Sequence, residues 1–60
     1  MLIERIKTKT INDNIFDLYR EFDDKYVIYV YKNIPEIQKK LKIGVFKEKE
    51  EAIEHFEELK

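Results

Sequence analysis

The run Tyr26-Val27-Ile28-Tyr29-Val30-Tyr31 constrains this chain more than any other feature. All six residues are β-branched or aromatic, a composition that favours a β-strand. Side chains alternate between the two faces of a strand, so this one would be apolar or aromatic on both faces. We therefore predict that it lies in the centre of a sheet. A chain of 60 residues has room for a single domain built round that sheet.

Three further strands are predicted. Residues 15–22 and 41–45 alternate apolar and polar side chains and are expected to flank the central strand, while residues 2–10 form a fourth strand at the edge. A turn over residues 23–25 would set Phe22 opposite Tyr26 and Leu18 opposite Val30. Arg20 then falls on the inner face, which requires a bulge or a side chain that extends to solvent. Residues 33–38 are expected to be a hairpin loop, with a short helix over residues 35–41 as the open alternative.

The last segment, residues 48–60, has apolar side chains at helical spacing and carboxylates in its first turn. This pattern predicts a helix whose apolar stripe covers one face of the sheet. The expected fold is α+β, a three- to four-stranded antiparallel sheet with one C-terminal helix packed on one face. The predicted core is Phe16, Leu18, Phe22, Tyr26, Ile28, Val30, Leu41, Ile43, Val45, Phe46, Ala52, Ile53, Phe56 and Leu59.

The opposite face of the sheet carries the candidate binding site. Its predicted members are Ile15, Asp17, Tyr19, Glu21, Val27, Tyr29, Tyr31, Lys40 and Lys42. Of these, Tyr19, Tyr29, Tyr31, Lys40 and Lys42 are the candidate contacts for a nucleic acid or a protein partner. Lysines suit phosphates, and tyrosine rings suit both bases and protein interfaces. The alternatives are a solvated face, or one covered by the N-terminal strand or by another chain.

Charge is unevenly placed along the chain. The net charge is −1, but residues 25–47 contain six lysines and one glutamate, whereas residues 48–60 contain six glutamates and two lysines. A basic middle segment favours nucleic acid as a partner. The acidic C-terminal helix is expected to be a solvated face, with mimicry of nucleic acid or docking of a basic partner as alternatives.

Residues 43–56 resemble the last strand and helix of the small DNA-binding domains of plant ethylene-response factors and of the N-termini of tyrosine-recombinase phage integrases. The residues that carry this resemblance are Gly44, Phe46, Glu50, Glu51, Ala52 and Phe56. The resemblance covers residues 15–60 and implies a three-stranded sheet packed on one helix, with the face away from the helix in the DNA major groove. It implies that Lys40 and Lys42 contact DNA beside Tyr29 and Tyr31. Lysine there, where the family has arginine, implies weak sequence specificity.

Residues for catalysis are scarce. The chain has no cysteine and no serine, one glycine and one histidine, His55, which is expected at the surface. We therefore predict no enzymatic activity, no cofactor, no metal site and no small-molecule substrate. No apolar run is long enough to span a membrane and the start lacks a signal peptide, so a cytoplasmic protein is expected. The Ile-, Lys- and Glu-rich composition is common in phages and mobile elements of AT-rich genomes, and in thermophiles.

Three functional hypotheses follow. The first is a nucleic-acid-binding module, with DNA as the favoured partner, that uses the sheet face. The second is a protein-interaction module, either a homodimer through the tyrosines or a phage-type inhibitor of a host protein, which uses the tyrosines or the acidic helix. The third is a structural accessory within a larger assembly.

Overall fold

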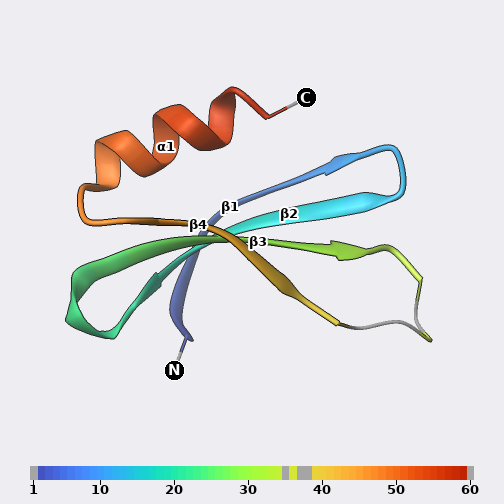
Figure 1. Ribbon diagram of the computed structural model, residues 1–60, viewed down its shortest axis with the longest axis horizontal. Coiled ribbons are helices and arrows are strands. Elements are labelled where there is room, and N and C mark those ends of the chain that lie inside the picture. The colour runs from blue at the N-terminus through green and yellow to red at the C-terminus, as the bar shows by residue number, and fades with distance from the viewer. Residues whose placement is uncertain (1, 35, 37–38, 60) are drawn as a thin grey trace.

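In the computed structural model, the chain forms one four-stranded antiparallel sheet and one C-terminal helix (Figure 1). The strands are β1 (Leu2–Ile11), β2 (Asn14–Glu21), β3 (Lys25–Lys32) and β4 (Leu41–Phe46), in the order β1-β2-β3-β4, and α1 is Lys49–Glu57. The structure describes residues 2–34, 36 and 39–59, with side chains from Glu4 onward. The predicted α+β class and the fourth strand at the edge are confirmed. Within the described residues, no helix has the length and apolar character that crossing a membrane requires.

The pairing of β2 with β3 differs from the prediction by two residues. The strands are joined by a turn of 3-10 helix over Phe22–Asp24, and Leu18 lies opposite Ile28 rather than opposite Val30. Because side chains alternate with a period of two, this shift leaves every residue of β2 on its predicted face. It does move Phe22 into the turn, where 55% of its surface is exposed, so its predicted place in the core is wrong.

Local chemistry of the turn explains the shift. Asp23 and Asp24 have positive φ angles of 69° and 55°, a conformation that aspartate tolerates better than most residues. Arg20, predicted on the inner face, extends to the edge of the sheet. Its Nε lies 3.5 Å from Glu4 Oε1 and its Nη1 lies 3.7 Å from Asp24 Oδ1. The arginine is therefore accommodated by acidic partners on β1 and in the turn.

β4 is the strand that departs most from the prediction. Gly44 lies opposite Ile28 and Lys42 lies opposite Tyr29, so Ile43 is an extra residue that makes a β-bulge. Gly44 shares the helix side of the sheet with Ile28, a core residue. The alternation predicted for residues 41–45 therefore points to the wrong faces over this part of the strand.

The exposure of β4 follows from this slip. A Cβ atom at Gly44 would lie 2.9 Å from the ring of Phe46, so this ring occupies the space that the glycine leaves on the helix side. Leu41, Ile43 and Val45 are 55%, 48% and 51% exposed, and their predicted place in the core is wrong. β4 therefore contributes an aromatic ring to the core and turns most of its aliphatic side chains to the surface.

The core lies between the sheet and α1. Leu18 and Ile28 from the sheet and Ala52 and Phe56 from the helix are buried together. Burial of one such large apolar side chain contributes about 1.5–3 kcal/mol. Partly buried residues complete the cluster: Ile6, Phe16, Tyr26, Phe46, Ile53 and Leu59. All except Ile6 were predicted in the core. Ile6 stands at a register irregularity of β1, between the pairs of Arg5 and Lys7.

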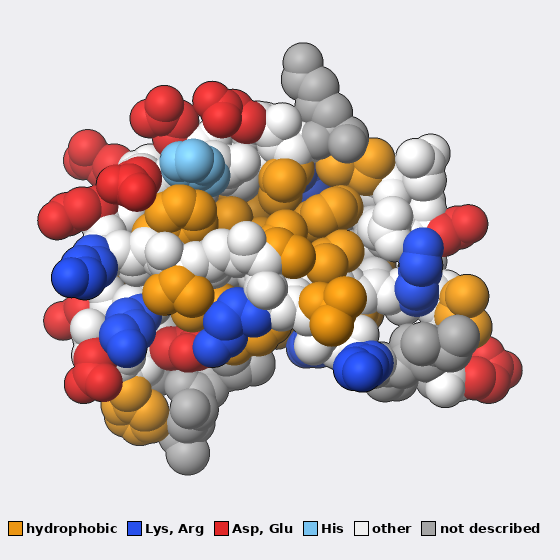
Figure 2. Space-filling view, viewed as in Figure 1, with side chains coloured by type: hydrophobic (Ala, Val, Ile, Leu, Met, Phe, Trp, Pro, Cys, Tyr) orange, Lys and Arg blue, Asp and Glu red, His pale blue; other side chains and the backbone are white. Residues whose placement is uncertain are grey.

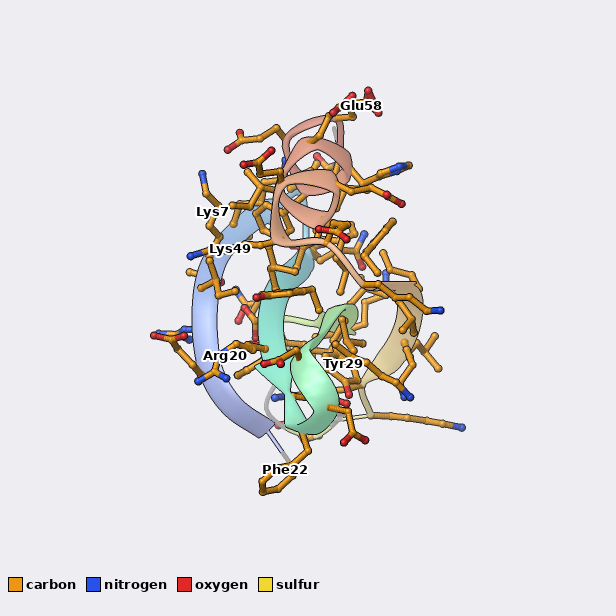
Figure 3. All side chains as sticks on the ribbon, turned by 90° about the vertical axis from the view of Figure 1, so that its left-hand side faces the viewer. Lys7, Arg20, Phe22, Tyr29, Lys49 and Glu58 are labelled. Carbon is orange, nitrogen blue, oxygen red and sulfur yellow. The ribbon has the colours of Figure 1, made fainter. Side chains whose placement is uncertain are left out.

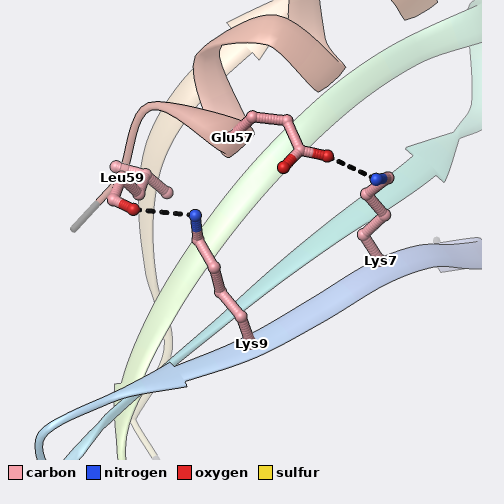
Figure 4. Close-up of polar contacts among 4 residues, drawn as sticks. All are labelled: Lys7, Lys9, Glu57 and Leu59. Carbon is pink, nitrogen blue, oxygen red and sulfur yellow. Dashed lines mark hydrogen bonds and ion pairs between the residues drawn. The ribbon is translucent and has the colours of Figure 1, made fainter.

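β1 is an edge strand of the sheet, and two of its lysines contact the C-terminal end of α1 (Figure 4). Lys7 forms an ion pair with Glu57, with 2.5 Å between Nζ and Oε1, and Lys9 Nζ donates a hydrogen bond to the Leu59 carbonyl at 2.8 Å. The Lys9 ammonium also lies 4.9 Å from the centre of the Phe56 ring. Cations at a helix C-terminus are favourable because this end carries partial negative charge. The hydrogen bond and charge of Lys7 lower the pKa of the Glu57 carboxyl.

The alternative of a short helix over residues 35–41 fails at its C-terminal end. Leu41 begins β4, and Lys39 and Lys40 belong to no helix or strand. Residues 35, 37 and 38 lie outside the described residues.

Candidate functional site

The five predicted site residues lie on or beside the sheet face away from α1. We call Tyr19, Tyr29, Tyr31 and Lys40 the tyrosine face. The rings of Tyr19 and Tyr29 meet edge to face, with 5.9 Å between their centres. Lys40 Nζ lies 5.0 Å from the centre of the Tyr31 ring and 5.5 Å from that of Tyr19. Lys42 lies opposite Tyr29 on β4 and is exposed. The period-two pattern of the strands places Tyr19, Tyr29, Tyr31 and Lys42 on one face, as predicted from the sequence, and Lys40, which precedes β4, lies against the tyrosine rings.

The layer beneath the tyrosine face is closed, and β1, the N-terminal strand that the sequence offered as one possible cover, takes part in closing it. Asp17 and Val27 were predicted on an open face, but their exposed fractions are 0% and 1%. Thr8 of β1 lies opposite Asp17, and its Oγ1 donates a hydrogen bond of 2.5 Å to Asp17 Oδ1. The Tyr31 hydroxyl donates to Asp17 Oδ2 at 3.0 Å. A buried carboxylate requires such donors, and here β1 and β3 supply them.

The tyrosine hydroxyls are largely committed within the protein. The Tyr29 hydroxyl donates a hydrogen bond to Glu21 Oε2. Burial, followed by this hydrogen bond and the charge of Glu21, raises the pKa of Tyr29 to about 12. Burial and the neighbouring Asp17 carboxylate likewise raise the pKa of Tyr31. Two of the three tyrosine hydroxyls are therefore neutral and donate hydrogen bonds to carboxylates on the same face. A ligand would have to displace these carboxylates before it could accept a hydrogen bond from either hydroxyl.

A second surface, which we call the β4 edge, was not predicted. It comprises Lys40, Leu41, Lys42, Ile43, Val45 and Lys47. β4 is paired with β3 on one side and is the last strand of the sheet on the other. Its aliphatic side chains are about half exposed, and Lys42 and Lys47 are exposed without an ion pair to any described residue. Figure 2 shows hydrophobic side chains along the line on which Figure 1 draws β4, with Lys or Arg side chains beside them.

The sequence contained one signal for this edge. Phe46 lies opposite Tyr26 on the core side, and the parity of these two aromatic residues turns Val45 outward. The Phe46 ring is further held by His55 of α1, with 4.7 Å between ring centres. Anchoring the strand on Phe46 rather than on its aliphatic residues would have predicted the exposed side chains.

The outer surface of α1 is acidic. Carboxylates cover the helix in Figure 2, and the exposed ones are Glu48, Glu50, Glu51, Glu54, Glu57 and Glu58. The molecule therefore carries an acidic helix and a lysine-bearing β4 edge, as the uneven charge of the sequence predicted. Within the described residues, no group of three or more histidine, aspartate or glutamate side chains could hold a metal ion, and no pocket is found.

Comparisons of the chain with protein-family models, with curated proteins and with solved structures found no match. The antiparallel sheet and C-terminal helix agree with the architecture that the resemblance to the ethylene-response-factor and integrase domains implied. The relation to that family stays a prediction.

Proposed function

We propose that this protein is a non-enzymatic protein-interaction module that binds an extended segment of a partner along the β4 edge. The observation that carries the proposal is the combination, on the last strand of the described sheet, of a backbone edge with three half-exposed aliphatic side chains, Leu41, Ile43 and Val45. When a peptide adds a strand to a sheet, main-chain hydrogen bonds supply affinity and alternate side chains supply specificity.

The contrast between the two edges of the sheet supports this assignment. Edge strands are normally protected by charged side chains, bulges or covering segments. β1 follows that rule from Glu4 onward, where the side chains are described: the exposed ones are Glu4, Arg5, Thr8 and Thr10, and Lys7 and Lys9 contact the C-terminal end of α1. β4 has a bulge and one lysine, Lys42, yet three of its aliphatic side chains are about half exposed to solvent. Exposed apolar side chains on a strand edge are unfavourable in water, and a partner strand would bury them.

Peptide selection tests the proposal and does not require the partner itself. Peptides of about ten residues, the upper length of common strands, would be selected from a random library on the wild-type protein. The amide resonances that they shift would then be mapped by NMR. We expect shifts over residues 40–47 and an affinity loss of about tenfold or more in Ile43→Ser. Phe22→Ser is the matched control, because Phe22 is equally exposed but projects from the β2–β3 turn at the end opposite α1 (Figure 3).

Two results would refute this function. One is a library that yields no binder at all. The other is a set of binders whose affinity is the same for Ile43→Ser as for the wild type, or whose shifts lie on α1 or on Tyr19 and Tyr31 and not on residues 41–47.

Nucleic-acid binding is the second candidate. It is favoured by the exposed lysines Lys39, Lys42 and Lys47, which form no ion pair with a described residue, and by the resemblance to DNA-binding domains. Of these lysines, Lys42 lies opposite Tyr29 of the tyrosine face. Asp17 and Glu21 on the same face, which already occupy two tyrosine hydroxyls, weigh against phosphates there and place this candidate second.

Salt dependence tests this second candidate. Binding to DNA or RNA should weaken steeply between about 50 and 200 mM salt, and Lys42→Glu should reduce the dependence on salt. Absence of binding to either nucleic acid at the lowest salt concentration would eliminate this candidate.

A further inference from the structure

We infer that the segment bound at the β4 edge is an acidic strand of another protein, with carboxylates alternating with apolar residues. This inference rests on the proposed function and specifies the chemistry of the partner. It follows from the positive charge of the β4 edge and from the side of the sheet on which Lys40 and Lys42 lie. Neither lysine forms an ion pair with a described residue.

The two faces of β4 differ in chemistry. Lys42 lies opposite Tyr29 and Lys40 rests on tyrosine rings, so both ammonium groups belong to the side away from α1. Leu41 and Phe46 lie opposite Val30 and Tyr26, residues of the helix side. Val45 lies opposite Val27, so on the side away from α1 an added strand would meet Lys40, Lys42 and Val45, and on the helix side it would meet Leu41 and Phe46. Opposite charges are favourable between neighbouring strands, so the side chains next to the two lysines would be Asp or Glu.

A second copy of this chain does not fit the edge. Pairing of β4 with β4 would bring together two copies of Lys42 and of the flanking Lys40 and Lys47, and like charges on neighbouring strands are destabilising. The chain's own cluster of glutamates cannot supply the strand either, because it lies on α1. That helix is tied to β1 through Lys7 and Lys9 (Figure 4). We therefore assign the complementary strand to a different protein.

Nucleic acid fits this surface less well than an acidic strand. Phosphates would pair with the lysines, but they offer no partner for the exposed aliphatic side chains of Leu41, Ile43 and Val45. An acidic and apolar strand satisfies the lysines, the aliphatic groups and the backbone edge of β4 together.

The experiment uses three fluorescent peptides of equal length that alternate valine with glutamate, threonine or lysine. We expect the glutamate peptide to bind about tenfold more tightly than the threonine peptide, to shift amides of residues 40–47, and to weaken with salt. The lysine peptide should be the weakest binder. Lys42→Gln should lower the affinity for the glutamate peptide several-fold and leave the affinity for the threonine peptide unchanged. Lys49→Gln is the matched control, because Lys49 is an exposed lysine at the start of α1 that points away from β4 (Figure 3).

The outcomes separate the two levels of the proposal. Equal binding of the glutamate and threonine peptides, with shifts over β4, would overturn the acidic inference and leave the strand-binding function standing. Failure of all three peptides to bind, together with an empty library selection, would overturn the function itself. A single-stranded oligonucleotide that outcompetes the glutamate peptide would overturn the assignment to a protein partner. Concentration-dependent dimers whose shifts lie on β4 would assign the edge to a second copy instead.

Discussion

Replacement of Asp17 by alanine should be among the most destabilising single changes in this protein. The carboxylate is fully buried and accepts hydrogen bonds from Thr8 and Tyr31. A hydrogen bond to a charged group contributes about 1.5–3 kcal/mol. The two hydroxyls are only partly buried and regain some water once the carboxylate is gone, so we expect a net loss of about 2–4 kcal/mol. The total stability expected for 60 residues is only about 3–9 kcal/mol.

A double-mutant cycle isolates the pair that matters. Urea unfolding followed by circular dichroism would be measured for Asp17→Ala, Tyr31→Phe and the double variant. We expect a coupling free energy of about 1–2 kcal/mol. Tyr19→Phe is the matched control, because Tyr19 is on the same face but its hydroxyl makes no hydrogen bond to a described residue. Its effect should add to that of Asp17→Ala within about 0.5 kcal/mol.

A coupling free energy below about 0.5 kcal/mol between Asp17 and Tyr31 would refute this reasoning. It would mean that water, and not the tyrosine, satisfies the carboxylate. Should Asp17→Ala fail to fold, Asp17→Asn serves in the same cycle, because it keeps the shape and one acceptor oxygen while removing the charge.

Three further predictions concern other parts of the fold. Glu57→Gln should lower the urea midpoint at neutral pH; since the folded-state pKa of Glu57 is depressed, this difference should disappear as pH falls through that pKa. Gly44→Ala should destabilise by about 1–3 kcal/mol, because its Cβ would meet the Phe46 ring at 2.9 Å, and Phe46→Leu in the same chain should recover part of the loss. Absorbance titration should find the phenol of Tyr29 ionising near pH 12, and Glu21→Gln should lower that pKa. The stability linked to this phenol is complete below its ordinary pKa of 10.0 and is lost as pH rises through about 12.

For the candidate site, the sequence predicted only which side chains share a face of the sheet. Tyr29 and Tyr31 share a face with Tyr19 because the period of a strand is two, and the observed shift in register preserved that parity. Their hydrogen bonds to Glu21 and Asp17 were not predictable. They depend on which residues lie opposite one another across three strands.

For β4 the predicted faces are wrong, and the error arises at Gly44, the one residue of the strand without a side chain. Gly44 resembles a polar position in an alternation with Ile43 and Val45, and this pattern predicts that both of them lie in the core. A glycine reveals nothing about the face it occupies, and a bulge at Ile43 breaks the period. The ring of Phe46 fills the space over Gly44, and this contact sets the orientation of the strand. The sequence signalled the exposed edge only through the parity of Phe46, and the bulge itself became evident only in the structure.

Local patterns in the amino-acid sequence were enough to predict the helix, the strands and the fold class. The apolar run from Tyr26 to Tyr31 requires a central strand, and the stripe that includes Ala52 and Phe56 requires a helix on one face, since local periodicity decides which side chains can be buried together. Contacts between the strands and the helix set which side chains on each surface are exposed and which are buried. The burial of Asp17 beneath the tyrosines and the exposure of β4 depend on register and on a bulge, which are settled by contacts between segments distant in the chain.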